Sequence, residues 1–366
     1  MNKNTDKPLV SIITVNYNGL EYLPELYNSL RTLTYKNCEL ILVDNASTDE
    51  SVPFIRKQYP EVIVLENPDN YMFARGNNEG IKRARGEIIC LLNNDVKVSP
   101  DFLEIIVREF SANPNMSACQ PKVLDLNHPD QFEYAGASGG YIDKYGYPFM
   151  RGRLFFTVEE DKGQYNNTQE IFWSTGACFF VRRSVLDKIG ILDEDFRMHM
   201  EEIDLCWRMH LTGLKIYCVP EAKGWHKGGG TLSTDNPRKI YWNFRNNIFL
   251  LVNNLEMFNL FRIMLFRLVL DGIAITRELL KGELKSALAI LQGYGWIVMN
   301  ISLIRRKRRE TQSLRQIQDS EVFQLIYPGS IVWEYFILKR QRFSELKNVT
   351  KMVSLNSRSS SSHGNR

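Results

Sequence analysis

The chain has 366 residues, 44% of them hydrophobic, and a formal net charge of +4. This length is sufficient for one large α/β core of roughly 200–250 residues with an appendage, and the hydrophobic content excludes a disordered protein. The charge is unevenly distributed, because residues 1–237 carry 25 Lys and Arg against 33 Asp and Glu, whereas residues 238–366 carry 21 against 9. We therefore expect the two parts of the chain to face different partners.

The six cysteines include no C-x-x-C pair, and most of them lie within apolar runs. This usage favours buried free thiols in a reducing compartment over a disulfide framework or a zinc site. The N-terminal stretch MNKNTDKPLVSIITV has no apolar segment ahead of a cleavage site. We therefore expect a protein that is not secreted.

The first hundred residues alternate between strand and helix patterns. The predicted strands lie in LVSIITVNYN, CELILVDNASTD, EVIVLENPDN and GEIICLLNNDV, and the predicted helices lie in LEYLPELYNSLRTL, SVPFIRKQYP and FARGNNEGIKRAR. Three such units feeding a fourth strand predict right-handed crossovers and a doubly wound parallel α/β sheet. Ligands of such sheets bind beyond the carboxyl ends of the strands, where these segments carry polar clusters.

The pattern becomes mixed between residue 100 and about residue 237. The stretch YAGASGGYIDKYGYP predicts loops and hairpins, and the strand GACFFVRR, the helix EEIDLCWRMHLTG and the strand LKIYCVP follow it. We expect a domain over residues 1–250, a basic helical region over 251–350 and a disordered low-complexity tail over 351–366.

Asp44 and Asn45 directly follow an apolar strand in VDNASTDES. A carboxylate or amide at this place can pair with the N3–H and a carbonyl of a pyrimidine base. The alternative is an Asx turn that leads into a helix cap, since Ser47, Thr48 and Asp49 are good capping residues. We assign the cap to Ser47–Asp49 and ligand contact to Asp44 and Asn45.

Asp95 ends the apolar run LLNNDV, after Asn93 and Asn94. Its carboxylate can hold a divalent cation that bridges two phosphates, with an amide oxygen of either asparagine as a neutral ligand. The alternative is a polar turn before the helix that Pro100 opens. The residues alone fit both interpretations.

Six acidic residues fall within the twelve positions from Asp193 to Asp204. Acidic side chains are favourable at a helix N-terminus, which accounts for part of this cluster. At helical spacing Leu205 and Met209 face the core, which leaves Glu201 or Glu202 at the opening of the helix. A carboxylate there can deprotonate an alcohol as a general base.

His226 lies between Trp225 and a run of glycines in KGWHKGGGT. The glycines let the backbone and the imidazole approach a phosphate or a metal ion, and imidazole is a common ligand of transition cations. The alternative is a structural histidine.

Six segments in this order resemble the family 2 glycosyltransferases with the GT-A fold, especially their rhamnosyltransferase-like bacterial branch: VSIITVNYNGLEYLPELYNSL, ELILVDNASTDES, GEIICLLNNDV, STGACFFVRRSVLDKIGILDEDF, EEIDLCWRM and WHKGGGT. The resemblance covers about residues 8–250. It implies a Rossmann-like, mostly parallel sheet with helices on both faces.

The resemblance also implies site residues. The NND segment occupies the family's DxD-like site, so that Asp95 binds Mg²⁺ or Mn²⁺ and the diphosphate, while Asn93 replaces the leading acid. His226 matches a histidine that approaches the metal in relatives. The implied nucleotide pocket comprises Val15, Asn16, Asp44, Asn45, Asn77, Asn93 and Asp95.

The EEID segment occupies the family's Glu-Asp dyad, whose second member is the catalytic base. That member is Glu202 here, one methylene longer than the usual Asp, which leaves Glu201 in competition for the role. The implied reaction is an inverting transfer of a sugar, with rhamnose from dTDP-rhamnose favoured, from a nucleotide diphosphate donor to a hydroxyl of a lipid-linked or cell-surface glycan.

The C-terminal third combines apolar helical patterns with basic residues. In residues 257–272 we expect Arg262 and Arg267 to reach lipid headgroups from a helix in the membrane plane. Residues 286–304 carry no charge and are followed by RRKRR at 305–309. We favour an interfacial or packed helix there over a membrane span, and anionic lipid over nucleic acid as the partner of the basic run. The expected location is the cytoplasmic face of the cell membrane.

Two other functions fit part of the sequence. An oxidoreductase would need G-x-G-x-x-G after the first strand, where VNYNGL supplies only Gly19. A non-catalytic membrane scaffold of the same fold is compatible with the departures at Asn93 and Glu202. The donor, the acceptor and the oligomeric state are not specified by the sequence.

Overall fold

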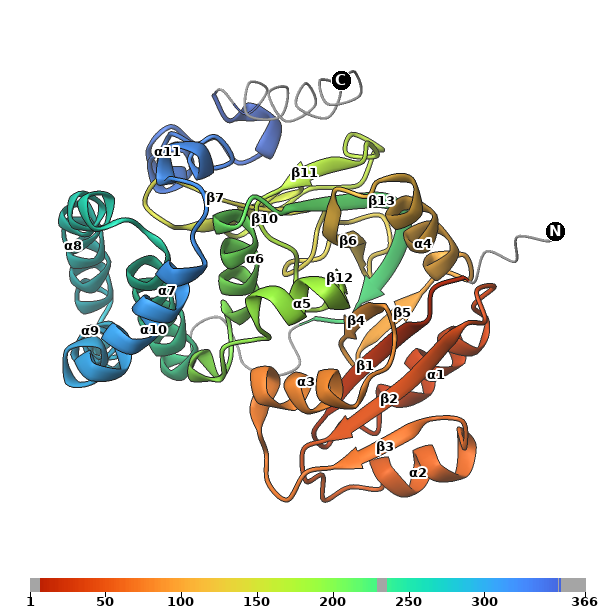
Figure 1. Cartoon of the computed structure of the whole chain (residues 1–366). Coiled ribbons are helices and arrows are strands. Elements are labelled where there is room, and N and C mark those ends of the chain that lie inside the picture. The colour runs from red at the N-terminus through yellow and green to blue at the C-terminus, as the bar shows by residue number, and fades with distance from the viewer. Residues whose placement is uncertain (1–6, 229–235, 348, 350–366) are drawn as a thin grey trace.

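The computed structural model describes residues 7–228, 236–347 and 349. Within them a nine-stranded sheet has the order β11-β13-β6-β12-β4-β1-β2-β3, with β5 paired to β13 (Figure 1). The strands are β1 (Val10–Asn16), β2 (Cys38–Asp44), β3 (Ile63–Glu66), β4 (Ile88–Leu92), β5 (Val96–Val98), β6 (Met116–Asp125), β11 (Gln169–Ile171), β12 (Cys178–Arg182) and β13 (Lys215–His226).

The predicted βα units are confirmed. Strands β1 to β4 are mutually parallel, and β12 lies antiparallel between β4 and β6. The connecting helices are α1 (Leu23–Arg31), α2 (Ser51–Gln58) and α3 (Met72–Arg83). Parallel pairing brings the carboxyl ends of β1, β2 and β4 to one edge of the sheet.

Helices cover both faces of this sheet, as predicted. Alternate strand residues point to opposite faces, so Ile12 and Leu42 pack in the core under α1, α2 and α4 (Phe102–Ala112). Ile13 and Val43 pack in the other core, which includes α3, α5 (Arg183–Ile189) and α6 (Glu201–Leu211).

The Gly/Tyr-rich stretch forms the predicted hairpin within a small antiparallel sheet. Its strands are β7 (Gly140–Ile142), β8 (Pro148–Met150), β9 (Arg153–Leu154) and β10 (Thr157–Val158).

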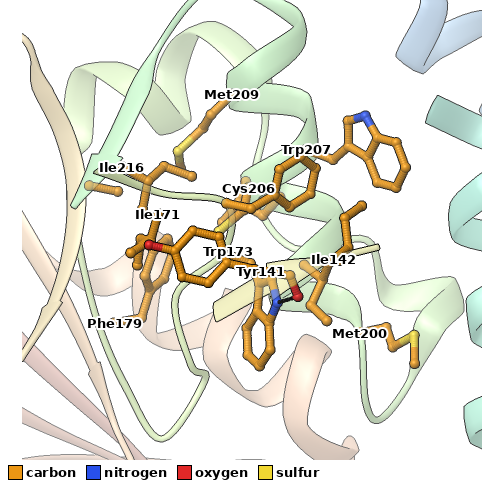
Figure 2. Close-up of a cluster of buried hydrophobic side chains, with 14 of the residues drawn as sticks. Tyr141, Ile142, Ile171, Trp173, Phe179, Met200, Cys206, Trp207, Met209 and Ile216 are labelled. Atoms are coloured by element: carbon orange, nitrogen blue, oxygen red, sulfur yellow. Dashed lines mark hydrogen bonds between the residues drawn. The ribbon is translucent and has the colours of Figure 1, made fainter. Parts of the chain in front are cut away.

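Helix α6 is anchored to both sheets by apolar side chains. Figure 2 shows Cys206 and Met209 of α6 among Ile171, Phe179 and Ile216 of the large sheet, and Tyr141 of β7 beside them. This packing fixes the helix, and with it the position of its N-terminus.

The C-terminal helices lie at the opposite end of the molecule from α1 and α2 (Figure 1). They are α7 (Pro237–Asn254), α8 (Met257–Leu280), α9 (Leu284–Met299), α10 (Ile301–Leu314) and α11 (Asp319–Val322), with short helical turns at Trp333–Ile337 and Phe343–Glu345; a further short turn, Glu194–Phe196, precedes α6. Ile248 and Phe249 of α7 are buried, and Phe249 lies in the same core as α6. The domain boundary that we predicted at residue 250 therefore falls within a buried helix.

Helix α8 corrects one prediction. Arg267 was expected to reach lipid headgroups, but it is 1% exposed and its Nη2 donates to Asp271 Oδ2 at 3.1 Å. Its Nη1 donates to the carbonyl oxygen of Tyr145 at 3.1 Å. Arg262 is exposed. The charged pair therefore lies on the inner side of α8. The attraction between Arg267 and Asp271, together with the further hydrogen bonds, offsets the hydration that both groups lose on burial.

No single helix in the described residues has both the length and the apolar content needed to cross a membrane. Helices α9 and α10 meet that criterion only as a pair, and they are bent by 76° at the break between them. The segment 286–304 is therefore not one continuous helix. The predicted tail at 351–366 lies outside the described residues, while all six cysteines are described and are free thiols.

Candidate active site

Polar side chains from three strand ends form one hydrogen-bonded network. Asn94 Nδ2, after β4, donates to Asn16 Oδ1 at the end of β1 over 2.9 Å. Asn16 Nδ2 donates to Asp44 Oδ1 at the end of β2 over 3.1 Å. The structure thus brings together residues of the predicted nucleotide pocket that lie far apart in the sequence.

Asp44 and Asn45 already have partners within the chain. The backbone N–H and the hydroxyl of Ser47, three residues on, donate to Asp44 at 2.8 and 2.6 Å, so the Asp44 side chain closes a local turn as in the alternative, with a wider span than an Asx turn. Asn45 Nδ2 donates to the carbonyl of Met72 at 3.0 Å and its Oδ1 accepts from Asn67 at 2.9 Å. Both residues therefore take part in the hydrogen bonding at the strand ends, and their contact with a base stays a prediction.

Close backbone packing positions Val15 and Asn77. A Cβ at Gly76 would lie 3.0 Å from Val15 Cγ1 and 3.1 Å from Asn45 Nδ2, so a larger residue there would require these side chains to move by a few tenths of an ångström. Asn77, one residue further, is 2% exposed and donates to the carbonyl of Phe73.

Asp95 lies in the turn between β4 and β5, beside His226. Pairing of β5 with the end of β13 brings His226 Nε2 to 2.9 Å from Asp95 Oδ1, and Asn93 Nδ2 lies 3.4 Å from the same nitrogen. His226 Nδ1 lies 3.3 Å from Glu133 Oε1. The imidazole is therefore enclosed between two carboxylates. Glu133 carries no motif or periodic signal in the sequence, so its place beside His226 was not predicted.

The electrostatics of this cluster favour ionised groups. Burial lowers the pKa of His226, but the carboxylates of Glu133 and Asp95 outweigh burial and raise this pKa to about 10. Burial alone would raise the pKa of Asp95, yet the hydrogen bond from His226 holds it below its usual value. Asp95 is thus an anion paired with an imidazolium near neutral pH.

Asp95 has the chemistry to hold a divalent cation. No group of three His, Cys, Asp or Glu side chains converges as a ligand set in the described part of the chain. However, Mg²⁺ commonly binds one or two carboxylates together with substrate phosphates, and Asp95 fits that pattern. His226 faces carboxylates with both nitrogens. Its predicted role as a ligand would require loss of a proton.

A second carboxylate pair opens α6. Glu201 is 3% exposed, and among the described residues neither Glu201 Oε2 nor Glu202 Oε2, both buried atoms, has a hydrogen-bond partner. Burial raises the pKa of Glu202 to about 7, although backbone N–H groups at the helix start partly oppose it. Burial and the charge of Glu202 raise the pKa of Glu201 well above its usual value. These are the properties of a carboxylate that can exchange a proton at neutral pH.

One loop connects the two carboxylate clusters. The carbonyl of Ala177 accepts from the backbone N–H of Asn93 at 3.0 Å. A Cβ on the preceding Gly176 would lie 3.9 Å from Glu202 Cδ. The DxD-like segment and the predicted base therefore face the same edge of the sheet.

The turn before α6 has a strained backbone. Arg197, His199 and Met200 have φ values of 62°, 68° and 71°, in the left-handed region that favours glycine. Such residues cost of order 1–3 kcal/mol each and cluster at active sites, where the surrounding structure holds them in place. This strain could not be predicted from the sequence, because no glycine marks the turn.

Residues 11–190 match the family described as Glycosyl transferase family 2. The chain belongs to glycosyltransferase family 2. This assignment confirms the resemblance, and it favours the transferase interpretation over the oxidoreductase.

Relatives of this family 2 glycosyltransferase include polysaccharide-biosynthesis proteins. It is 29% identical to the O-antigen biosynthesis protein RfbC of Myxococcus xanthus over 243 residues, which cover 64% of this chain and 18% of that protein. It is 26% identical to the N-acetylglucosaminyl-diphospho-decaprenol L-rhamnosyltransferase of Mycobacterium tuberculosis over 237 residues, or 60% of this chain and 76% of that protein.

A solved structure supports the GT-A type of fold. The structure of GalNAc-T7 with UDP, GalNAc and Mn²⁺ matches 65% of this chain and 48% of its own, with a TM-score of 0.50 and 15% sequence identity. The chain therefore spans less than half of GalNAc-T7, and at this identity the likeness concerns the fold alone.

Proposed function

We propose that this glycosyltransferase moves a sugar from a nucleotide diphosphate donor to a hydroxyl group with inversion of configuration. The observation that carries the proposal is Glu202, whose buried Oε2 has no partner among the described residues and whose pKa is raised to about 7. It lies one loop away from the Asp95 cluster. Transfer of a sugar to an alcohol requires a general base whose pKa is near the working pH, placed beside the residues that would bind the diphosphate.

The donor would bind along the strand ends. The network of Asn16, Asp44 and Asn45, with Val15 and Asn77 beside it, would receive the nucleoside. Asp95 would hold Mg²⁺ or Mn²⁺, with the amide oxygen of Asn93 as the neutral ligand, and would orient the diphosphate. When bound, the cation stabilises the negative charge that develops on the leaving diphosphate.

The acceptor would bind on the Glu202 side. Glu202 takes the proton of the acceptor hydroxyl while that oxygen forms a bond to the anomeric carbon. The bond from this carbon to the diphosphate oxygen breaks on the opposite face, which inverts the configuration. Burial raises the pKa of both carboxyl groups, which titrate as a coupled pair, so we assign the base to Glu202 from its place as the second member of the dyad.

We favour rhamnose from dTDP-rhamnose as the donor. The rhamnosyltransferase-like motifs support this choice, and so does the name of the mycobacterial relative, an L-rhamnosyltransferase. The test is incubation of the purified protein with a panel of nucleotide sugars and Mg²⁺ or Mn²⁺, followed by donor hydrolysis and thermal melting. Hydrolysis of dTDP-rhamnose and a higher melting temperature in its presence would support this choice. The same result with another sugar nucleotide would replace rhamnose as the donor sugar. If no donor is hydrolysed or raises the melting temperature, the proposed transfer is contradicted.

We also propose that α8 and α9 bind the cytoplasmic face of an anionic membrane that presents a lipid-linked acceptor. The exposed side of α8 is mostly apolar, with Arg262 and Arg277 as exposed cations, while its charged pair faces inward, the reverse of a helix that faces water. Arg305 and Arg309, which are exposed on α10, would add attraction to anionic headgroups. The exposed apolar residues of α8 and α9 include Met257, Phe258, Phe261, Leu265, Phe266, Leu268, Val269, Ile273, Leu284, Leu288 and Leu291.

Sedimentation with vesicles tests this surface on the full chain. Replacing both Phe258 and Phe261 by Ser should reduce the fraction that pellets with anionic vesicles, because these side chains are 75% and 67% exposed. Phe156 is 62% exposed but belongs to the connection between β9 and β10, so Phe156→Ser is the matched control. Equal pelleting of the double variant and the control would refute membrane binding through α8.

A further inference from the structure

The strained turn before α6 is held by a side chain from α7. Asn246 Nδ2 lies 3.0, 2.8 and 2.8 Å from the carbonyl oxygens of Phe196, Met198 and His199. Asn246 is fully buried. The two N–H groups of one amide therefore serve three carbonyl groups of this turn, and at least one of these hydrogen bonds is shared.

Arg245 fixes the direction of the Asn246 amide. Its Nη1 donates to Asn246 Oδ1 at 2.5 Å and to the carbonyl of Asp195 at 2.6 Å. Since a guanidinium can only donate, the amide oxygen must point to it and the amide nitrogen must point to the turn. The guanidinium also lies 3.5 Å from the ring centroid of Trp296 on α9.

The turn has no comparable support from α6 itself. Met200, which caps α6, is left-handed and makes no side-chain capping hydrogen bond to the described residues. The carbonyl group of Phe196 also accepts from the backbone N–H of Met198 at 2.7 Å. Those of Met198 and His199 precede the helix and lie outside its ladder of hydrogen bonds, so they need donors from elsewhere. Asn246 supplies those donors from a helix about fifty positions later in the chain.

We propose that Asn246 is a positioning residue for the catalytic base Glu202. It holds the left-handed turn of residues 197–200, and this turn sets where α6 begins and where the carboxylate of Glu202 points. The inference rests on the proposed function, since it assigns the purpose of the turn to the base. It makes the C-terminal helices part of the catalytic machinery, because α7 provides Asn246 and α9 supports it through Trp296 and Arg245.

The test compares Asn246→Asp with Asn246→Ala in the full chain. The carboxylate of the Asp variant keeps the size of the amide but cannot donate to the three carbonyl oxygens. Asn253→Ala is the matched control, because Asn253 lies on the same helix, is 1% exposed, and makes no side-chain hydrogen bond to any described residue. The measurements are kcat, the Kd for UDP and dTDP with Mn²⁺, and backbone hydrogen exchange over residues 197–203.

We expect both Asn246 variants to lose about 10²-fold in kcat, since a misplacement of about 1 Å at a reacting group has that effect. We expect their nucleotide Kd to stay within about twofold of the parent, because positioning of the base does not concern the donor pocket. Exchange over 197–203 should rise in both, and Asn253→Ala should leave all three quantities unchanged.

The outcomes separate this inference from the proposed function. Unchanged exchange over 197–203 in both Asn246 variants overturns the positioning role. Faster exchange with an unchanged kcat also overturns it, whereas kcat of Glu202→Gln in the same assay decides separately whether Glu202 is the base. A proportionate loss of nucleotide affinity, or equal effects of Asn253→Ala, would mean that Asn246 supports the fold in general and not the turn.

Discussion

The two carboxylate clusters of the candidate active site lie in opposite environments. Asp95 is paired with His226, which keeps the pKa of its carboxyl group low. Glu202 lies at the same edge of the sheet, its Oε2 has no partner in the described part of the chain, and burial raises its pKa to about 7. The comparison shows that the neighbours of a carboxyl group set its pKa and so the role it can take. A carboxylate that stays ionised can bind a cation, whereas one whose pKa is near neutral can accept and release a proton.

Removal of the poised carboxylate should have the largest effect. Glu202→Gln should lower kcat by about 10²–10⁴-fold, the usual contribution of a general base, with little change in donor affinity. Glu202→Asp should retain activity, since it restores the residue usual at this place in the family. Steady-state kinetics of these two variants and of Glu201→Gln decides the assignment. If only Glu201→Gln is impaired, the base is one residue upstream.

The pH dependence of kcat should follow the same carboxyl group. Only the deprotonated form of Glu202 can accept a proton, so kcat should fall by about tenfold per pH unit below pH 7 and level off above it. Rates measured between pH 5 and 8 with saturating substrates and metal check this expectation. A flat profile over this range would mean that proton transfer to Glu202 does not limit the reaction.

The paired carboxylate should respond to its second neighbour. Glu133→Gln removes one of the two carboxylates that face His226, so the imidazole is held less firmly against Asp95. We expect the Mn²⁺ concentration required for half-maximal activity to rise by about 10–100-fold, as for loss of other groups that orient a metal site. Glu170→Gln is the control, because Glu170 is another buried, ion-paired glutamate. The same metal requirement in both variants would show that Glu133 does not act on Asp95.

The smallest expected effect is a gain in stability. A carboxyl group whose pKa rises from 4.5 to about 7 on folding binds more protons in the folded state, so the free energy of unfolding falls as pH rises between these values. Glu202→Gln avoids this loss. Its Tm should therefore exceed that of the parent at pH 8, with a difference that shrinks toward pH 5. A Tm difference that is constant from pH 5 to 8 would contradict the raised pKa.

The sequence predicted those parts of the site that follow from local pattern and sheet topology. Asn16 and Asp44 end strands, and Asp95 follows a third strand, that parallel pairing brings to one edge, and α6 was placed by its apolar spacing. Glu133 and Asn246 were missed because their partners lie about 90 and 50 positions away along the chain, at distances that no periodic pattern encodes.

Arg267 shows the other limit of such patterns. A helix with one arginine among apolar residues fits either a membrane surface or a buried ion pair, because periodicity identifies a face and not what covers it. Asp271 lies one helical turn away and was available as a partner. The tertiary contacts with Tyr145 and Asn247 decided in favour of burial.

Calorimetric titration of UDP and dTDP in the presence of Mn²⁺ tests the division of labour between the two carboxylates most directly. We predict that Asp95→Asn loses the metal-dependent binding of nucleotide, whereas Glu202→Gln binds it with the affinity of the parent protein. Metal-dependent binding that survives in Asp95→Asn, or that is lost equally in both variants, would contradict the assignment of Asp95 to the donor and of Glu202 to the acceptor.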